Sequence, residues 1–172
     1  VVELCGLTFL HSDRSKSNII ATALFGDGAS AAVISCQGNG VEIRGASEYT
    51  WPDSLDIMGW DVVDEGLKAV FSQDIPSLVR KDMGALVDNF LSTQGLTKND
   101  IHSFLCHPGG AKVLDAIEEA LNLPSGGLKH SRNVLRDYGN MSAATAMFVL
   151  KSVLEHPKHG NYLLSAFGPG FT

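Results

Sequence analysis

The sequence has few cysteines and no motif that sets cysteine or histidine at metal-binding spacing. Its three cysteines, Cys5, Cys36 and Cys106, each lie in an apolar run, and neither Cys-x-x-Cys nor His-x-x-x-His occurs. An odd number of cysteines in apolar surroundings indicates reduced, buried thiols rather than disulfides, as in cytoplasmic proteins. We therefore expect a cytoplasmic protein with no metal site.

Long hydrophobic runs and blocks of positive charge are also missing. No apolar run approaches the roughly 20 residues of a membrane helix, so we expect no membrane partner. The N-terminus lacks the basic flank and apolar stretch of a signal peptide, and the missing initial methionine suggests a piece of a longer protein. With 19 acidic and 13 basic residues and no Lys/Arg block, nucleic acid is not an expected partner, because that affinity begins with phosphate neutralisation.

Strand-like and helix-like segments alternate along the 172 residues, which are enough chain for one domain with a core. Residues 76–91 repeat apolar positions at three- and four-residue steps, the pattern of a helix with one buried face. Residues 142–154 are apolar nearly all round, which indicates a helix buried between two layers. This alternation predicts an α/β layered fold. The remaining expected elements are helices at residues 17–24 and after Gly109-Gly110, and strands at residues 2–9, 31–36, 41–49, 101–107 and 162–166.

Two local details belong to this expected architecture. The connector QGNG at residues 37–40 ends in Asn-Gly, a strong signal for a hairpin between the strands at 31–36 and 41–49. In the helix that follows Gly110, we expect Glu118 and Glu119 to face outward, opposite the apolar residues. Residues 50–70 give no clear pattern.

Three motifs combine chemically useful residue types with turns that expose them. CHPGG at residues 106–110 ends an expected buried strand, where the scaffold fixes a side chain and leaves its tip open. YGNMSA at residues 138–143 enters the buried helix, and AFGPG at residues 166–170 forms a turn that can bring backbone close to a ligand. From the residues alone, His107 could be a core histidine, Asn140 a helix cap and Phe25 a core aromatic side chain.

HPGG, YGNMS, LFGDGA and FGPG, at these separations, resemble chalcone synthase and its bacterial relatives, the type III polyketide synthases of the thiolase superfamily. ELCGLTF and MGWDV resemble the bacterial alkylpyrone type more than the plant enzymes. The resemblance covers essentially the whole chain and implies a thiolase-like αβαβα fold made of two similar halves. It implies that residues 1–50 end the N-terminal thiolase-like half and that residues 51–172 form the C-terminal chalcone/stilbene synthase-like domain.

The resemblance also implies a catalytic Cys-His-Asn triad. His107 matches the family histidine and Asn140 matches the family asparagine, whereas the nucleophilic cysteine falls before Val1, so the fragment alone is expected to be inactive. The two matched residues would hold the enolate oxygen formed when malonyl-CoA loses carbon dioxide, and the enolate would attack an acyl-cysteine. The implied substrates are malonyl-CoA and an acyl-CoA starter, with no cofactor beyond these CoA thioesters. The full-length protein would be a homodimer.

The same resemblance assigns residues to the substrate cavity. Phe25 matches a gatekeeper phenylalanine, Ala69 takes the place of a second one, and Trp60 replaces a glycine of the plant cavity. A large indole there would shrink the cavity, so we expect few extensions, with triketide or tetraketide pyrones as products. The other expected lining residues are Gly109, Gly110, Ser142, Phe167, Gly168, Pro169 and Gly170.

Two other functions stay open at this point. A ketoacyl-carrier-protein synthase III of fatty acid synthesis shares the fold and the triad, although an Asn-containing motif would be expected there instead of HPGG. A non-catalytic thiolase-fold module used for assembly would keep the motifs for packing alone. The residues before Val1 would discriminate, because a cysteine in the family position indicates an enzyme.

Overall fold

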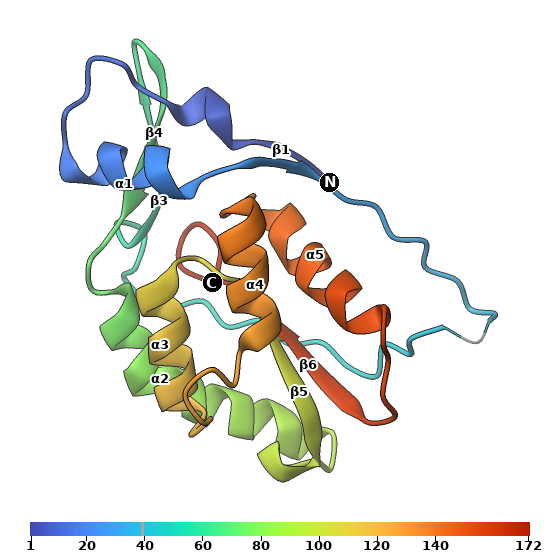
Figure 1. Ribbon diagram of the computed structural model, residues 1–172. Coiled ribbons are helices and arrows are strands. Elements are labelled where there is room, and N and C mark those ends of the chain that lie inside the picture. Colours follow the sequence, from blue (N-terminus) through green and yellow to red (C-terminus); the bar gives the residue numbers. More distant parts are fainter. Residues whose placement is uncertain (39) are drawn as a thin grey trace.

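The computed structural model describes residues 1–38 and 40–172, and within them helices and strands form an α/β fold (Figure 1). These strands pair into three two-stranded sheets, of which β5–β6 is parallel and the other two are antiparallel. The helices are α1 (Lys16–Leu24), α2 (Ile75–Thr93), α3 (Ala111–Ala120), α4 (Lys129–Tyr138) and α5 (Ala143–Leu154), with the short 3-10 turns η1 (Cys5–Thr8) and η2 (Lys98–Asp100). The strands are β1 (Val2–Leu4), β2 (Asp27–Ala29), β3 (Met58–Val63), β4 (Gly66–Phe71), β5 (Ile101–Cys106) and β6 (Asn161–Ser165).

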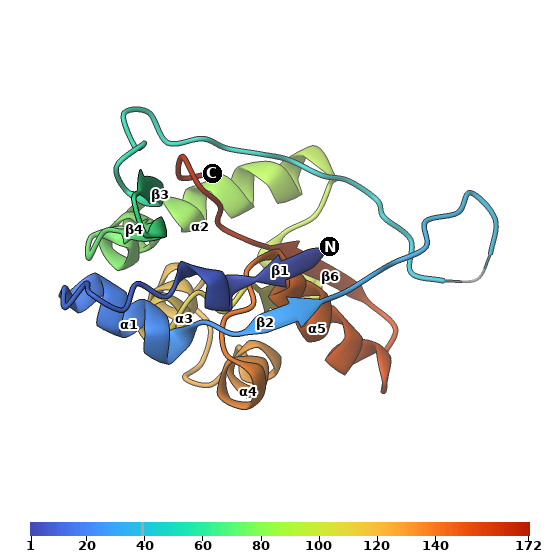
Figure 2. The ribbon, with the colours of Figure 1, turned by 90° about the horizontal axis from the view of Figure 1, so that it is seen from above.

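Helix α5 lies between two sheets, as its apolar sequence predicts (Figures 1 and 2). Strands β5 and β6 contact it on one side, and β1 and β2 contact it on the other. Its buried positions include Ala144, Ala146, Val149 and Val153, and the two alanines let neighbouring backbone approach closely. Because α5 begins at Ala143, the YGNMSA motif stands at the entrance to this buried helix.

The largest core forms where α2 and α3 pack together beside β5. Helix α2 buries a four-residue repeat that includes Val79, Met83 and Val87, which confirms the helix predicted from that periodicity. The two helices approach so closely at Gly84 that a Cβ there would lie 2.7 Å from the carbonyl oxygen of Ala120. This packing fixes α3, whose first turn follows the HPGG motif.

Helix α4 covers part of the face of α3 that was expected to be exposed to solvent. The expectation that Glu118 faces outward is therefore wrong. Glu118 is buried, although Glu119 is exposed as predicted. The Glu118 carboxylate accepts hydrogen bonds from the backbone N–H of Leu128 at 3.0 Å and from Arg132 Nη2 at 2.7 Å. Burial raises the pKa of Glu118, but the hydrogen bonds from Arg132 and Leu128 outweigh that effect and hold the pKa below its ordinary value.

The N-terminal region departs most from the predicted strands. The strand predicted at residues 2–9 ends at Leu4, and η1 follows it. Residues 31–36 and 41–49 form no strand, because within the described chain no neighbour offers them a hydrogen-bonded ladder, and the side chains of Val33 and Ile43 are 97% and 71% exposed. Cys36, predicted to be buried, is exposed in the same segment. The hairpin turn predicted at 37–40 includes Asn39, which lies outside the described residues.

Most of residues 50–70, where no clear pattern was found, belongs to the hairpin of β3 and β4. Its register sets Trp60 opposite Ala69 and Met58 opposite Phe71. Because side chains alternate along a strand, these four residues share one face of the hairpin. That face is directed toward the Phe25 ring, which lies 6.4 Å from the rings of Trp60 and Phe71, measured between centroids.

Candidate active site

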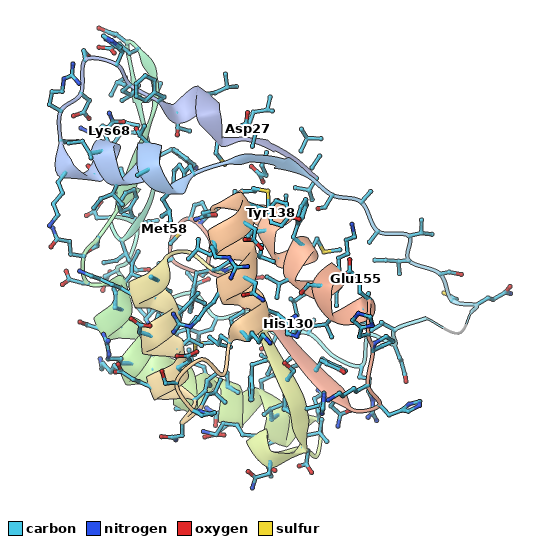
Figure 3. All side chains as sticks on the ribbon, viewed as in Figure 1. Asp27, Met58, Lys68, His130, Tyr138 and Glu155 are labelled. Atoms are coloured by element: carbon cyan, nitrogen blue, oxygen red, sulfur yellow. The ribbon has the colours of Figure 1, made fainter. Side chains whose placement is uncertain are left out.

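The LFGDGA and YGNMSA motifs lie side by side, joined through their backbones. The Asn140 N–H donates to the carbonyl oxygen of Leu24 at 2.8 Å, and the Gly26 N–H donates to the carbonyl oxygen of Asn140 at 3.0 Å. Phe25 and Asn140 therefore form a parallel bridge between segments more than a hundred residues apart. Figure 3 labels one residue of each motif, Asp27 and Tyr138.

Glycines make this close approach physically achievable. A Cβ on Gly139 would lie 2.7 Å from the Leu24 carbonyl oxygen, and one on Gly26 would lie 2.6 Å from the Tyr138 carbonyl oxygen. Gly139 also adopts φ 73° and ψ −166°, a combination that is essentially confined to glycine. The glycines of both motifs are thus explained by a contact that places Asn140.

Gly139→Ala is expected to lower the free energy of unfolding by about 2 kcal/mol or more, because it combines backbone strain with a backbone clash. Urea unfolding of the chain would measure the change. Gly95→Ala is the matched control, since Gly95 also has a positive φ, of 68°, but an added Cβ there meets nothing within 4 Å. Equal losses in the two variants would contradict the proposed close approach.

The Asn140 side chain has one end engaged by the start of α5 and the other directed at the HPGG motif. Its Oδ1 accepts a hydrogen bond from the Ser142 N–H at 2.9 Å, which orients the carboxamide, whereas the N-cap position of α5 belongs to Ser142 and Asn140 is not the cap. Its Nδ2 lies 3.5 Å from the Gly109 carbonyl oxygen, at the outer limit of a hydrogen bond. The contact with Gly109 is the sole hydrogen bond that Asn140 Nδ2 makes among the described residues. Because a carboxamide nitrogen carries two hydrogens, one of them remains to donate to a ligand.

His107 directly follows β5, and its backbone N–H donates to the Ser165 carbonyl oxygen at 2.7 Å. The side chain is buried, and its Nδ1 has no hydrogen-bond partner in the part of the chain that the structure describes. Burial lowers the pKa of His107 to about 4, so the imidazole is neutral near pH 7. A neutral ring can donate one hydrogen bond and accept another.

Stability should therefore depend on pH through His107. Its pKa falls from an ordinary 6.5 to about 4 on folding, so its contribution is intact above pH 6.5 and is lost as the pH drops toward 4. Between pH 7 and pH 4.5 the wild-type chain should lose about 2 kcal/mol more than His107→Gln, whose amide does not titrate. Urea unfolding at both pH values would measure this difference. Parallel losses in the two proteins would show that the ring is not buried as a neutral group.

His107 and Asn140 both border one broad, open hollow that runs along much of the described chain. Gly109 lies between them without obstruction, because even an added Cβ on it would remain 3.9 Å from the Cδ2 atom of His107. An imidazole and a carboxamide from distant parts of the sequence thus face the same space. In chemical terms, the pair offers neutral hydrogen-bond donors to an oxygen that gains negative charge.

Most of the other residues expected to contact substrate line this cavity too. Phe25, Trp60 and Ala69 form one wall, together with Phe71, which the sequence analysis missed. Phe71 could have been predicted from Ala69, because residues two apart on a strand point to the same face. Gly109, Gly110, Ser142, Phe167, Gly168 and Pro169 also line the cavity.

Gly170 has a different environment from its neighbours in the AFGPG motif. It does not line the cavity within the described structure. Its N–H donates to the Met58 carbonyl oxygen at 2.9 Å, and its own carbonyl oxygen accepts from the Ser54 hydroxyl at 2.8 Å. The contacts are those of a turn residue that anchors the end of the loop.

The buried cysteines of this chain are poorly suited to act as nucleophiles. Cys106 is completely buried, and desolvation raises the pKa of its thiol to about 11. Burial also raises the pKa of Cys5, with a further contribution from Glu3.

Across residues 1–38 and 40–172, no three His, Cys, Asp or Glu side chains gather as metal ligands. No helix in these residues is long and apolar enough to cross a membrane.

A helix enclosed by two sheets, with a histidine after one strand and an asparagine before that helix bordering one hollow, is the arrangement expected of a thiolase-like α/β protein. Residues 42–172 match the family described as chalcone and stilbene synthases, C-terminal domain. The chain belongs to the chalcone and stilbene synthase family and corresponds to the C-terminal portion of type III polyketide synthases. The resemblance and the thiolase-like fold inferred from the sequence are thereby confirmed.

Individual relatives agree with this assignment. The chain is 42% identical to a Bacillus subtilis (strain 168) protein provisionally named a chalcone synthase, covering 99% of this chain and 50% of the relative. It is 41% identical to 1,3,6,8-tetrahydroxynaphthalene synthase of Streptomyces peucetius subsp. caesius, covering 99% of this chain and 47% of that protein. The chain therefore spans about half the length of the curated relatives it matches.

A solved structure shows the same similarity in three dimensions. The 1,3,6,8-tetrahydroxynaphthalene synthase of Streptomyces coelicolor A3(2), a bacterial type III polyketide synthase, superposes with a TM-score of 0.92 at 25% identity. That alignment covers 98% of this chain and 49% of the Streptomyces chain. The family match favours a type III polyketide synthase over the ketoacyl-carrier-protein synthase III alternative.

Proposed function

We propose that this chain supplies the oxyanion-stabilising part of an enzyme that condenses malonyl-CoA with an acyl-CoA starter by decarboxylation. The observation that carries the proposal is that His107 and Asn140 open onto one cavity, with Asn140 Nδ2 directed toward Gly109 beside the histidine. Residues 1–50 would end the N-terminal half of the enzyme, and residues 51–172 would be its C-terminal domain. The complete enzyme would be a cytoplasmic homodimer that needs no metal.

In the proposed reaction, the malonyl thioester loses carbon dioxide, and the electron pair of the broken bond forms an enolate. The thioester oxygen gains the negative charge and accepts hydrogen bonds from His107 and from Asn140 Nδ2. Because Nδ1 of His107 has no partner among the described residues, the tautomer protonated at Nε2 is the suitable donor. The enolate carbon then attacks an acyl group carried as a thioester on cysteine, and the cysteine leaves as a thiolate.

The nucleophilic cysteine would come from outside these 172 residues. The low pKa of His107 reflects burial without any compensating negative charge. A cysteine thiolate placed against the ring would raise the pKa of the imidazole, and the imidazolium would in turn lower the pKa of the thiol. The proposed enzyme therefore needs both parts before an acyl group can be held.

The test uses the chain joined to a cysteine-bearing N-terminal half, and the 172 residues alone for comparison. Both proteins are incubated with malonyl-CoA and a panel of acyl-CoA starters, and products are identified by mass spectrometry. Malonyl-CoA-dependent polyketides from the joined protein, and none from the 172 residues, are expected. Failure of the joined protein with every starter, or a product from the 172 residues alone, would contradict the proposal.

Trp60→Gly in the joined protein is expected to shift the products toward longer chains by at least one malonyl unit. Trp60 projects from β3 into the wall opposite Ala69, so removing its indole enlarges the cavity. Trp60→Phe keeps an aromatic ring there and serves as the matched control. Mass spectrometry gives the ratio of tetraketide and longer products to triketides. An unchanged ratio in Trp60→Gly would show that this wall does not limit extension.

A further inference from the structure

The Phe167–Thr172 segment, whose first three residues line the cavity, is held by a group of contacts centred on Trp51, which borders the cavity as well. The backbone N–H of Trp51 donates to the Phe171 carbonyl oxygen at 3.1 Å. The Trp51 indole lies 4.6 Å from the Phe171 ring and 6.2 Å from the Phe167 ring, measured between centroids. Figure 2 shows the C-terminal end of the chain near α2 and near the irregular segment that leads to β3. One tryptophan therefore contacts both ends of the segment.

The Phe171 conformation shows that these contacts hold the segment in place. Phe171 is completely buried and has φ 52°, in the left-handed region that bulky side chains disfavour. Such a residue persists only where surrounding packing determines its position. Trp51 supplies that packing through its ring and its backbone N–H.

The indole of Trp51 is itself fixed by a charged group on α2. Its Nε1 donates to Asp82 Oδ2 at 2.8 Å, so the ring is tied to the helix that carries the main core. A hydrogen bond to a charged acceptor is stronger than one between neutral groups. The chain of contacts runs from α2 through Asp82, Trp51 and Phe171 to the cavity wall.

We propose that Trp51 and Asp82 are positioning residues that set the length of the polyketide by fixing the wall formed by Phe167, Gly168 and Pro169. This inference rests on the proposed function. Neither residue touches the reacting atoms in this account. Loosening the wall should enlarge the space beside His107 and admit longer intermediates, whereas the decarboxylation groups His107 and Asn140 stay where β5 and α5 hold them.

The test uses the chain joined to its cysteine-bearing half and compares product length with decarboxylation. Trp51→Phe keeps an aromatic ring but loses the N–H that bonds Asp82, and Asp82→Ala removes the acceptor. Each should raise the ratio of longer to shorter products by about tenfold, the lower end of the range for a hydrogen bond to a charged group. The kcat for malonyl-CoA decarboxylation should change by less than that ratio. Asp82→Asn, whose amide oxygen still accepts the indole N–H in a weaker, neutral bond, should bring the ratio closer to that of the wild type than Asp82→Ala does.

Arg80→Ala is the matched control on the same helix, because Arg80 pairs with exposed Glu119 and does not touch Trp51. Its product ratio should equal that of the wild type. An unchanged ratio in both Trp51→Phe and Asp82→Ala would overturn the proposal. Equal losses of extension and decarboxylation, with a lowered Tm, would reduce the two residues to a general structural role and would overturn it as well.

A second readout separates this inference from the proposed function. Backbone amide resonances of Gly168 and Gly170 in the 172-residue chain report the wall directly, without any catalysis. They should shift in Trp51→Phe and Asp82→Ala, and shift less in Asp82→Asn than in Asp82→Ala. If these shifts occur while the joined protein makes no polyketide, the proposed function fails and the positioning contact stands. If the resonances do not move, the positioning contact fails regardless of activity.

Discussion

Asn140→Ala in the joined protein should lower the rate of malonyl-CoA decarboxylation by about a hundredfold or more, the usual effect of deleting one oxyanion donor. His107→Ala should have an effect of similar size, because both side chains serve one oxygen in the proposed site. The double variant should fall short of the product of the two effects, since residues that act as a unit are not additive. Stopped-time assays of carbon dioxide release from malonyl-CoA would measure these rates.

Asn140 has a second role that must be separated from catalysis. Its Oδ1 accepts the Ser142 N–H at the start of α5, and losing such a contact costs about 1 kcal/mol. Asn140→Asp keeps this acceptor but has no amide N–H to donate to a ligand or to the Gly109 carbonyl oxygen, so it should retain the helix start and still lose decarboxylation. Asn161→Ala, on β6, is the control for a general asparagine effect. Near wild-type decarboxylation in Asn140→Asp would remove Asn140 from the mechanism.

Glu118→Ala should lower the free energy of unfolding by about 2 kcal/mol, because it leaves the buried Leu128 N–H without an acceptor and removes one of the two carboxylates that pair with half-buried Arg132. The Glu118 side chain is 7% exposed and bonds both Arg132 and the Leu128 N–H. Glu119→Ala is the matched control, since its carboxylate pairs with Arg80 at the surface and should contribute less than about 1 kcal/mol. Urea unfolding of the two variants gives both values. Equal effects would mean that α4 is not anchored through Glu118.

The elements with strong periodicity were predictable from the sequence, and those that depend on distant partners were not. Helix α2 followed from the spacing of its apolar residues, and helix α5 followed from a segment that is apolar nearly all round. Helix α4 was missed because its buried face includes polar Ser131, whose hydroxyl donates to the Cys106 carbonyl oxygen at 2.6 Å. Residues 31–36 and 41–49 have strand-like composition, but a strand forms only where a neighbour pairs with it.

The site was predictable only in part. The residues alone left His107 and Asn140 as a core histidine and a cap, and resemblance to a family was needed to place them together. The structure adds the physical basis for that proximity, which is the backbone bridge between Phe25 and Asn140 and the contact between Asn140 and Gly109. Local sequence patterns missed Phe71 as a cavity-lining residue and wrongly predicted that Glu118 is exposed. The environment of each residue depends on which element packs against it, and a local pattern does not contain that information.

A crystal structure of the joined protein with a bound, unreactive malonyl-CoA analogue would test the central claim most directly. The account predicts that the thioester oxygen lies about 2.7–3.2 Å from both the His107 imidazole nitrogen and Asn140 Nδ2, the range of an N–H···O hydrogen bond. A thioester oxygen that contacts only one of these two groups, or that binds in a space neither of them faces, would contradict it.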